Sequence, residues 1–182
     1  MNPAPKYFDE LKRSMEYLAR DPRTFFLGQA VACAGTGMSN TLKDVEPGKL
    51  WELPVDEEMQ MGISTGLALD GYVPVSIYPR WNFLLLAINQ IVNHLDKLPA
   101  MSGGGYQPRV IIRTGIGSEV PLHPQHQHVG DFTEAFRLMC STIEVIRCDE
   151  PDQIFPAYEK ALLRDDGKST IIVEWGDYYN LK

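Results

Sequence analysis

The sequence is poor in cysteine. Cys33, Cys140 and Cys148 are its 3 cysteines, an odd number, and no two of them stand in a CxxC pair. This usage does not match a disulfide framework or a cysteine-based zinc site, and no neighbouring residues mark an activated thiol. We therefore expect three reduced thiols with structural roles.

Positive charge and long apolar runs are also scarce. The formal net charge is −7, with 17 Lys and Arg against 24 Asp and Glu, whereas nucleic-acid phosphates require a basic surface. No apolar run reaches the roughly 18 residues of a membrane span, and the N-terminal MNPAPKYFDELKR lacks a signal-peptide core. We expect a cytoplasmic protein with no nucleic-acid partner and no membrane partner.

Several common catalytic motifs are missing. The SGGG stretch at 102–105 lacks the GxxxxGK[ST] or GxGxxG frame of a phosphate-binding loop. The sequence also contains no HExxH helix and no Ser-His-Asp or Cys-His framework that spacing would support.

Helical and strand patterns alternate along the chain. Helices are expected at 6–21, 58–70, 83–98 (ending at Pro99), 131–140 and 152–163. Strands are expected at 24–27, 73–78, 109–113, 143–146 and 170–174, and loops at 34–40, 102–105 and 114–127. This alternation predicts an α/β fold with a doubly wound, mostly parallel β-sheet flanked by helices. We expect one domain over 1–182, with an N-terminal helix within 1–22.

The segment PVDEEMQMGISTGLALDGYVPV, residues 54–75, carries the strongest local signal. Glu57 opens the predicted helix, where the macrodipole favours a carboxylate. Gly62 and Gly66 share one helix face and allow another backbone to approach closely. The pattern suggests a cofactor site at a subunit contact, and a plain N-capped packing helix explains the same residues.

The loop IGSEVPLHPQHQHVGD carries a histidine cluster, His123, His126 and His128. Imidazoles at this spacing invite a metal site, but a loop with two prolines offers no regular ligand face. The other interpretations are proton donors or hydrogen-bonding groups in a substrate cleft, and surface histidines without function. Asp131 is close enough in sequence to orient one imidazole.

The stretch YPRWNF, residues 78–83, places large rings between a strand end and a helix start. Such rings usually pack into the core or cap a sheet. The functional alternative is a flat surface that stacks on a heteroaromatic ligand.

Four motifs in order resemble one known family. FFLGQAV (25–31) is similar to its FLLGEEV, and PVDE with the later glycines and GYVPV is similar to PISE…G…G…GLRPV. WNF with MSGG is similar to FNF…MSGG, and Arg113 with QHQ is similar to R…QHSQ. The chain resembles the pyrimidine-binding (Pyr) domain of transketolase-like, thiamine-diphosphate-dependent enzymes. The nearest match is the N-terminal half of 2-oxo acid dehydrogenase E1 β subunits.

The resemblance implies the thiamine-diphosphate-binding fold and a cofactor site. Glu57 matches the glutamate that hydrogen-bonds the N1′ atom of the aminopyrimidine and thereby promotes removal of the thiazolium C2 proton. Phe83 matches the ring that packs on the aminopyrimidine, and its neighbour Trp81 joins it as a cofactor-binding residue.

The resemblance also assigns the histidines. His126 matches the active-site histidine that handles protons or holds the substrate. His123 and His128 have no firm counterpart and are expected to face the same cleft as substrate-contacting residues. On this reading the chain's own residues bind no metal.

The departures from the family pattern imply a partner. Ala30 stands where the β subunits usually carry an acid, and the following loop is shorter. The chain has no GDG…N motif, which in the family binds Mg²⁺ and the diphosphate, and we expect it to lack the C-terminal transketolase-type domain. The resemblance therefore implies thiamine diphosphate and Mg²⁺ bound through a separate E1 α-like subunit, in an α2β2 heterotetramer.

The leading hypothesis is a Pyr-domain subunit of a split enzyme. It would decarboxylate a 2-oxo acid or similar donor, or transfer an acyl or aldehyde group from it. One alternative is a non-catalytic assembly or regulatory subunit of such a complex. Another is a metal-dependent enzyme that uses the histidine cluster.

Overall fold

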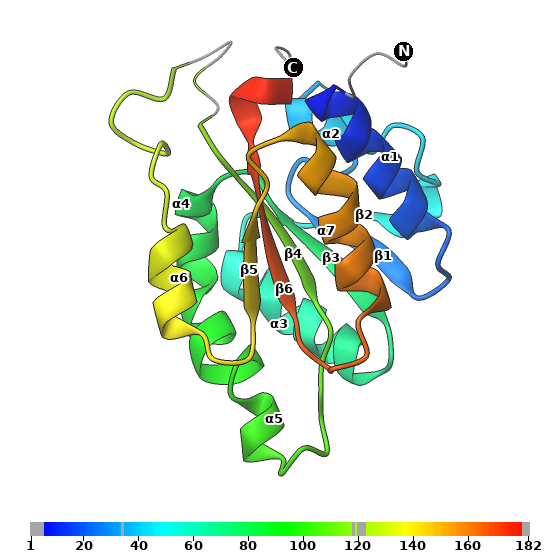
Figure 1. Ribbon diagram of the computed structural model, residues 1–182, viewed down its shortest axis with the longest axis vertical. Coiled ribbons are helices and arrows are strands. Elements are labelled where there is room, and N and C mark those ends of the chain that lie inside the picture. Colours follow the sequence, from blue (N-terminus) through cyan, green and yellow to red (C-terminus); the bar gives the residue numbers. More distant parts are fainter. Residues whose placement is uncertain (1–5, 34, 118, 120–122, 180–182) are drawn as a thin grey trace.

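The computed structural model describes residues 6–33, 35–117, 119 and 123–179. Within them, parallel strands form one central sheet in the order β2-β1-β3-β4-β6-β5 (Figure 1). The strands are β1 (Thr24–Gly28), β2 (Leu50–Glu52), β3 (Val73–Tyr78), β4 (Ile111–Ile116), β5 (Glu144–Arg147) and β6 (Thr170–Trp175).

Helices cover both faces of this sheet, which confirms the doubly wound α/β prediction (Figure 1). One face packs against α1 (Tyr7–Ala19) and α7 (Pro151–Leu163). The other face packs against α3 (Glu57–Leu69), α4 (Trp81–Leu84) and α6 (Thr133–Met139). The shorter elements are α2 (Gly37–Asn40), α5 (Leu98–Met101), η1 (Pro47–Lys49), η2 (Leu85–Ala87), η3 (Gln90–Leu95) and η4 (Gly176–Tyr179).

Side-chain alternation along the strands builds two separate cores. In β4, Ile111 faces the core under α1 and α7, while Ile112 faces the core under α3 and α4. In β6, Ile172 faces the core under α1 and α7, and Val173 faces the core under α3 and α4. Because both faces are covered, β3 and β4 are buried along their whole length, as expected for a parallel sheet.

The path of the chain creates a switch point between β1 and β3. From β1 the chain passes outward to β2, and from β3 it passes in the opposite direction to β4. Connections that leave adjacent strands in opposite directions open a crevice at the carboxyl ends of those strands, where ligands of such folds bind. These ends lie at the top of Figure 1.

Several short elements were not predicted, namely α2, β2, α5, η1 and η4. The segment 34–40, expected to be a loop, contains α2, whose start is a capping box of Thr36 and Ser39. The edge strand β2 spans only 3 residues, too few for an alternating pattern to show in the sequence.

The predicted long helix at 83–98 is wrong in detail. It is divided into α4, η2 and the π-helical η3, in which the backbone N–H of Asp96 bonds the Ile91 carbonyl at 2.9 Å. Pro99 does not end it, because it lies in the first turn of α5, where a missing N–H costs no helical hydrogen bond.

The fourth strand begins and ends later than predicted. β4 starts at Ile111 and continues to Ile116, so three residues of the expected 114–127 loop belong to the sheet. Arg109 precedes the strand, and its guanidinium donates to the carbonyl oxygens of Leu162 and Arg164 at the end of α7.

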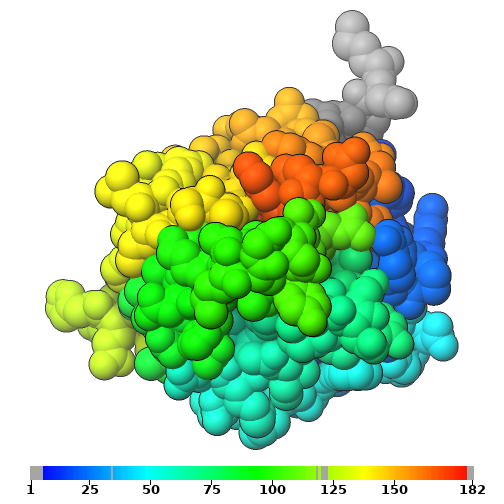
Figure 2. Space-filling view, turned by 90° about the horizontal axis from the view of Figure 1, so that it is seen from below, coloured from blue at the N-terminus to red at the C-terminus, as the bar shows by residue number. Residues whose placement is uncertain are grey.

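A buried carboxylate joins η3 to the start of β5. Asp96 accepts hydrogen bonds from the backbone N–H groups of Ser141 at 2.8 Å and Thr142 at 2.7 Å. Figure 2 shows this end of the molecule from outside, with the green part of the chain packed against the yellow part. Burial alone would raise the pKa of Asp96, but Lys97 and the hydrogen bonds from 141–142 lower it to about 2.

Asp96→Asn is expected to lower the free energy of unfolding by about 2 kcal/mol, since hydrogen bonds to a charged acceptor are weakened or lost. The folded-state pKa lies below the ordinary value of 3.8, so the contribution is fully present above pH 4. It is lost as pH falls from about 4 to about 2. Urea unfolding at pH 7 and pH 2.5 measures this. An equal difference in the free energy of unfolding between wild type and variant at both pH values would contradict it.

Candidate functional site

Glu57 lies beside the carboxyl ends of β1 and β3, at the switch point. It is the first residue of α3, and Asp56 caps the helix by accepting a hydrogen bond from the Met59 N–H at 2.9 Å. This cap fixes the direction of the first turn. The Glu57 side chain is only 4% exposed, so a carboxylate at the positive end of the helix dipole is held out of bulk water.

Groups from the ends of β1 and β3 hold Glu57. Its Oε1 accepts a hydrogen bond from Gln29 Nε2 at 3.1 Å, and its backbone carbonyl accepts one from the Tyr78 hydroxyl at 3.2 Å. Burial, aided by the nearby Glu57 charge, raises the pKa of Tyr78, so this hydroxyl keeps its proton and donates. Glu57 is thus tied to both strands of the switch point.

Gln60 and Gly28 both contact the end of β3 at the switch point. Gln60 is fully buried, and its Nε2 donates to Ser76 Oγ at 3.1 Å and to the Ile77 carbonyl at 2.9 Å. Gly28 has a φ of +144°, and a Cβ there would lie 2.2 Å from the same carbonyl oxygen. Only glycine allows the chain to leave β1 this close to β3.

Phe83 presents a half-buried ring that already stacks on a heteroaromatic group. The His128 imidazole lies 4.8 Å from it, centroid to centroid, with an interplanar angle of 29°. The His128 backbone has a φ of +60°, and its carbonyl accepts a hydrogen bond from Arg80 at 3.2 Å. Residues 80–83 after β3 and the end of the histidine loop therefore meet.

The other two predicted histidines lie elsewhere on that loop. His123 pairs with Glu119 at 3.3 Å, and its Nδ1 accepts the Gln125 N–H at 3.0 Å. His126 is exposed. The structure thus brings His128 to Phe83, while the substrate roles of His126 and His123 stay predictions.

Trp81 lies in the core beneath α3, α4 and α6. It is 1% exposed and packs against Phe136 of α6 at 4.8 Å, centroid to centroid. Its role as a cofactor-binding residue stays a prediction.

Several buried polar atoms near the ends of β3 and β4 have no hydrogen-bond partner among the described residues. They are Gln60 Oε1, Trp81 Nε1, Asn82 Oδ1, Thr114 Oγ1 and His128 Nδ1. Since burying an unpaired polar atom costs free energy, such atoms are available to a polar ligand.

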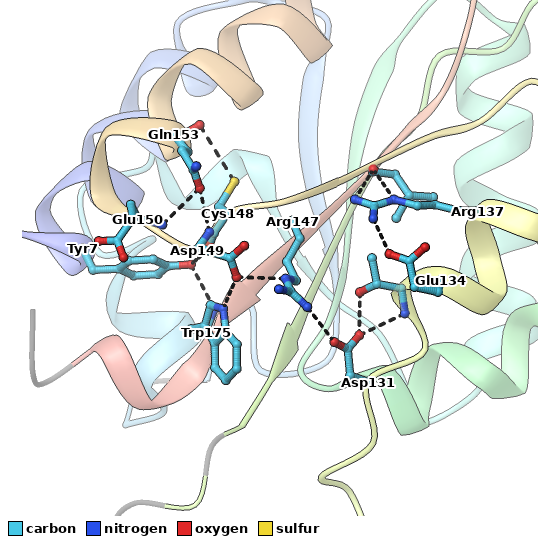
Figure 3. A network of polar contacts seen from close by, with 12 residues as sticks. Tyr7, Asp131, Glu134, Arg137, Arg147, Cys148, Asp149, Glu150, Gln153 and Trp175 are labelled. Carbon is cyan, nitrogen blue, oxygen red and sulfur yellow. Dashed lines mark hydrogen bonds and ion pairs between the residues drawn. The ribbon is translucent and has the colours of Figure 1, made fainter.

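The histidine loop is fixed at both ends. At its start, Asp177 accepts a hydrogen bond from the Glu119 N–H at 2.6 Å. At its end, Asp131 pairs with Arg147 at 3.1 Å, and Arg147 pairs with Asp149 at 2.8 Å (Figure 3). The hypothesis that Asp131 orients an imidazole is wrong, because its carboxylate pairs with Arg147 and accepts hydrogen bonds from the N–H and hydroxyl of Thr133.

Sequence reasoning missed Gln29 and Gln60 as parts of this site, and it considered Tyr78 only as one ring of the YPRWNF stretch. Each acts through a contact that crosses strands, and no local pattern marks such contacts. Gln29 could have been found from its place in FFLGQAV, directly before the Ala30 position already singled out.

No three His, Cys, Asp or Glu side chains group as metal ligands in the described part of the chain. None of the helices described there is long and apolar enough to cross a membrane.

The parallel sheet, its switch point and the buried carboxylate beside it define a doubly wound α/β domain, a class that binds ligands at the carboxyl ends of its strands. A family model described as "Transketolase, pyrimidine binding domain" matches residues 12–179. The chain belongs to the transketolase pyrimidine-binding domain family, which confirms the resemblance found in the sequence.

Relatives and a solved structure agree with this family. The mitochondrial pyruvate dehydrogenase E1 component subunit beta of Ascaris suum is 30% identical, over 83% of this chain and 42% of that protein. The corresponding subunit of Gracilaria tenuistipitata var. liui is 29% identical, over 96% of this chain and 54% of that protein. A split gene transketolase, described as an inactive beta4 tetramer, has the same fold, with a TM-score of 0.69 at 15% identity over 92% of this chain and 50% of that chain.

The chain therefore spans about half the length of the curated relatives it matches, 42% and 54% in these two cases. Because named relatives include mitochondrial forms, the cytoplasmic location stays a prediction.

Proposed function

We propose that this chain is the Pyr-domain subunit of a split thiamine-diphosphate-dependent enzyme that acts on a 2-oxo acid or a similar donor. The observation that carries the proposal is the nearly buried Glu57 carboxyl at the switch point of a pyrimidine-binding domain. A carboxyl in this position can hold or release a proton at one atom of a ligand that enters the crevice.

The residues present fit an aminopyrimidine ring. The Phe83 face accepts a flat heteroaromatic group, as its stack with the His128 imidazole indicates, and a pyrimidine is a group of this kind. The unpaired oxygens of Asn82 and Thr114 offer acceptors for an exocyclic amino group. When bound, thiamine diphosphate would supply the carbanion chemistry that protein side chains lack.

In this proposal the chain's own residues orient the ring and manage one proton. Phe83 would pack on the ring face, and Glu57 would share a proton with the ring nitrogen opposite it. Gln29 and Tyr78 would keep the Glu57 carboxyl and its backbone in place. His126 and His128, on the loop beside Phe83, would contact the substrate.

The rest of the site would come from another subunit. A Cβ added at Gly62 or Gly66 would meet no atom within 4 Å, so this face of α3 is open for close contact. Met59 and Leu69 on the same face, and Val55 just before α3, are exposed apolar side chains. We assign this face to an α2β2 assembly with a diphosphate-binding E1 α-like partner, through which Mg²⁺ would be bound.

Reconstitution tests the proposal. The isolated chain is expected to bind thiamine diphosphate with Mg²⁺ weakly and to have no 2-oxo acid decarboxylase activity, because it lacks a diphosphate-binding GDG…N motif. Adding a subunit that carries this motif is expected to restore both, with at least a hundredfold gain in cofactor affinity, about 2.7 kcal/mol. Calorimetry and decarboxylation assays on each chain and on the mixture measure this. Full activity of this chain alone would overturn it.

A further inference from the structure

The turn after β1 is organised around one carboxylate. Glu52, the last residue of β2, accepts the backbone N–H of Ala30 at 2.8 Å through Oε1. Its Oε2 accepts the N–H of Val31 at 2.8 Å and that of Ala32 at 2.7 Å. Consecutive N–H groups that converge in this way form an anion-binding concavity, and here a side chain of the same protein fills it.

This contact determines the backbone conformation of the turn. Ala30 has a φ of +56°, a left-handed conformation that a non-glycine residue adopts only at a free-energy cost. The three hydrogen bonds to Glu52 offset that cost. Burial alone would raise the pKa of Glu52, but the N–H groups of 30–33 reverse this and lower it, so the carboxylate is ionised at neutral pH.

The residue placed by this turn is Gln29. On one side of it, Gly28 is pressed against the end of β3, where a Cβ would lie 2.2 Å from the Ile77 carbonyl oxygen. On the other side, Ala30 is bound to Glu52. With both neighbours fixed, the Gln29 side chain reaches across 28 positions of sequence to the Glu57 carboxylate.

We propose that Glu52 is a positioning residue for Glu57: its carboxylate holds residues 30–32 so that the Gln29 amide fixes one oxygen of the Glu57 carboxyl. The effect of Glu52 on catalysis rests on the proposed function. The structural dependence of Gln29 on Glu52, and of the Glu57 carboxyl on Gln29, does not. Glu52 itself does not touch the carboxyl it positions. It acts through the backbone of the turn and through Gln29.

Nuclear magnetic resonance of the isolated chain tests the coupling without cofactor. The Gln29 side-chain amide signal, identified by its loss in Gln29→Ala, is expected to move in Glu57→Gln, which replaces its charged acceptor. Glu52→Gln is expected to move the same signal and to speed amide hydrogen exchange of residues 30–32 about tenfold or more, since a neutral amide accepts more weakly than a carboxylate. Glu58→Gln, the matched control, changes an exposed neighbour that bonds Asn89 and is expected to leave the Gln29 signal unmoved.

If Glu52→Gln does not fold, Glu52→Asp replaces it, because that variant keeps the charge but draws the carboxylate back by one methylene. It is expected to move the Gln29 signal in the same direction. A Gln29 signal unchanged in the folded Glu52 variant would overturn the proposal.

A double-mutant cycle in the assembled complex tests the catalytic meaning. Gln29→Ala and Glu52→Gln are each expected to lower kcat about 10- to 100-fold with little change in KM, as misplacement of a reacting group does. Because Glu52 acts through Gln29, kcat of the double variant is expected to fall no further than kcat of Gln29→Ala alone. If the kcat losses of the two single variants multiply in the double variant, Glu52 does not act through Gln29. If the proposed function fails, Glu57→Gln complexes keep full turnover while the resonance coupling among Glu52, Gln29 and Glu57 remains.

Discussion

Glu57→Gln is expected to lower kcat of the assembled complex about 10³-fold, within the range by which a positioned acid or base accelerates proton transfer. Gln has nearly the size of Glu and can still accept the Gln29 hydrogen bond through its amide oxygen. It cannot hold or release a proton at a ring nitrogen. The loss is therefore expected in turnover, while the fold and the assembly persist.

Steady-state kinetics, thermal unfolding and sedimentation of the same variant separate these effects. Glu58→Gln is the control, since Glu58 is exposed and bonds only Asn89 among the contacts described for its side chain. It is expected to retain wild-type turnover. Wild-type turnover in Glu57→Gln complexes would instead indicate a non-catalytic assembly or regulatory subunit.

Arg113→Met is expected to lower the free energy of unfolding by about 3–5 kcal/mol, because it leaves the Glu174 carboxylate buried without its charge partner. Both side chains are 0% exposed. Arg113 Nε and Nη2 donate to the two oxygens of Glu174 at 2.8 Å and 2.9 Å, and Nη1 donates to Thr41 Oγ1 at 2.9 Å.

Two tyrosines complete this buried network. The hydroxyls of Tyr158 in α7 and Tyr179 in η4 donate to the Glu174 oxygens, one to each. Burial and the Glu174 charge raise the pKa of both hydroxyls, so they stay protonated donors. Burial would lower the pKa of Arg113, but Glu174 reverses this and raises it. The network therefore joins β4 and β6 to α7 and η4.

Urea unfolding of Arg113→Met measures the effect. The matched control is Lys160→Met, which removes the exposed cation of the Lys160–Glu144 pair and is expected to change stability by less than about 1 kcal/mol. The double variant Arg113→Met/Glu174→Leu removes both charges and is expected to recover part of the loss. Equal effects of Arg113→Met and Lys160→Met would contradict the buried-pair account.

Patterns within one element were predicted well. The alternating, β-branched run at 73–78 is β3 at the same bounds, and the glycine-containing helix expected at 58–70 is α3, shifted by one residue at each end. The placement of Glu57 at the helix N-terminus followed from the same segment. These features depend on neighbours within about one helical turn or one strand, which the sequence displays directly.

Features that depend on another part of the chain were predicted poorly. The YPRWNF pattern does not show that Trp81 packs against Phe136 of α6. The long helix expected at 83–98 is divided, and the π turn within it ends at Asp96, which binds 141–142. Asp131 was assigned to a histidine, whereas the fold places Arg147 of β5 beside it.

The sequence by itself determined the α/β alternation, the family and the identity of Glu57 and Phe83 as candidate site residues. Periodicity and motif order are properties of adjacent residues, so no folding is needed to detect them. Only the tertiary structure decided that Glu57 is nearly buried, that Gln29 and Tyr78 hold it, and that Glu52 holds the turn carrying Gln29. These hydrogen bonds are about 3 Å long and join residues that are far apart in the sequence. Such residues come within reach of one another only when the parallel strands that carry them lie side by side in the folded sheet.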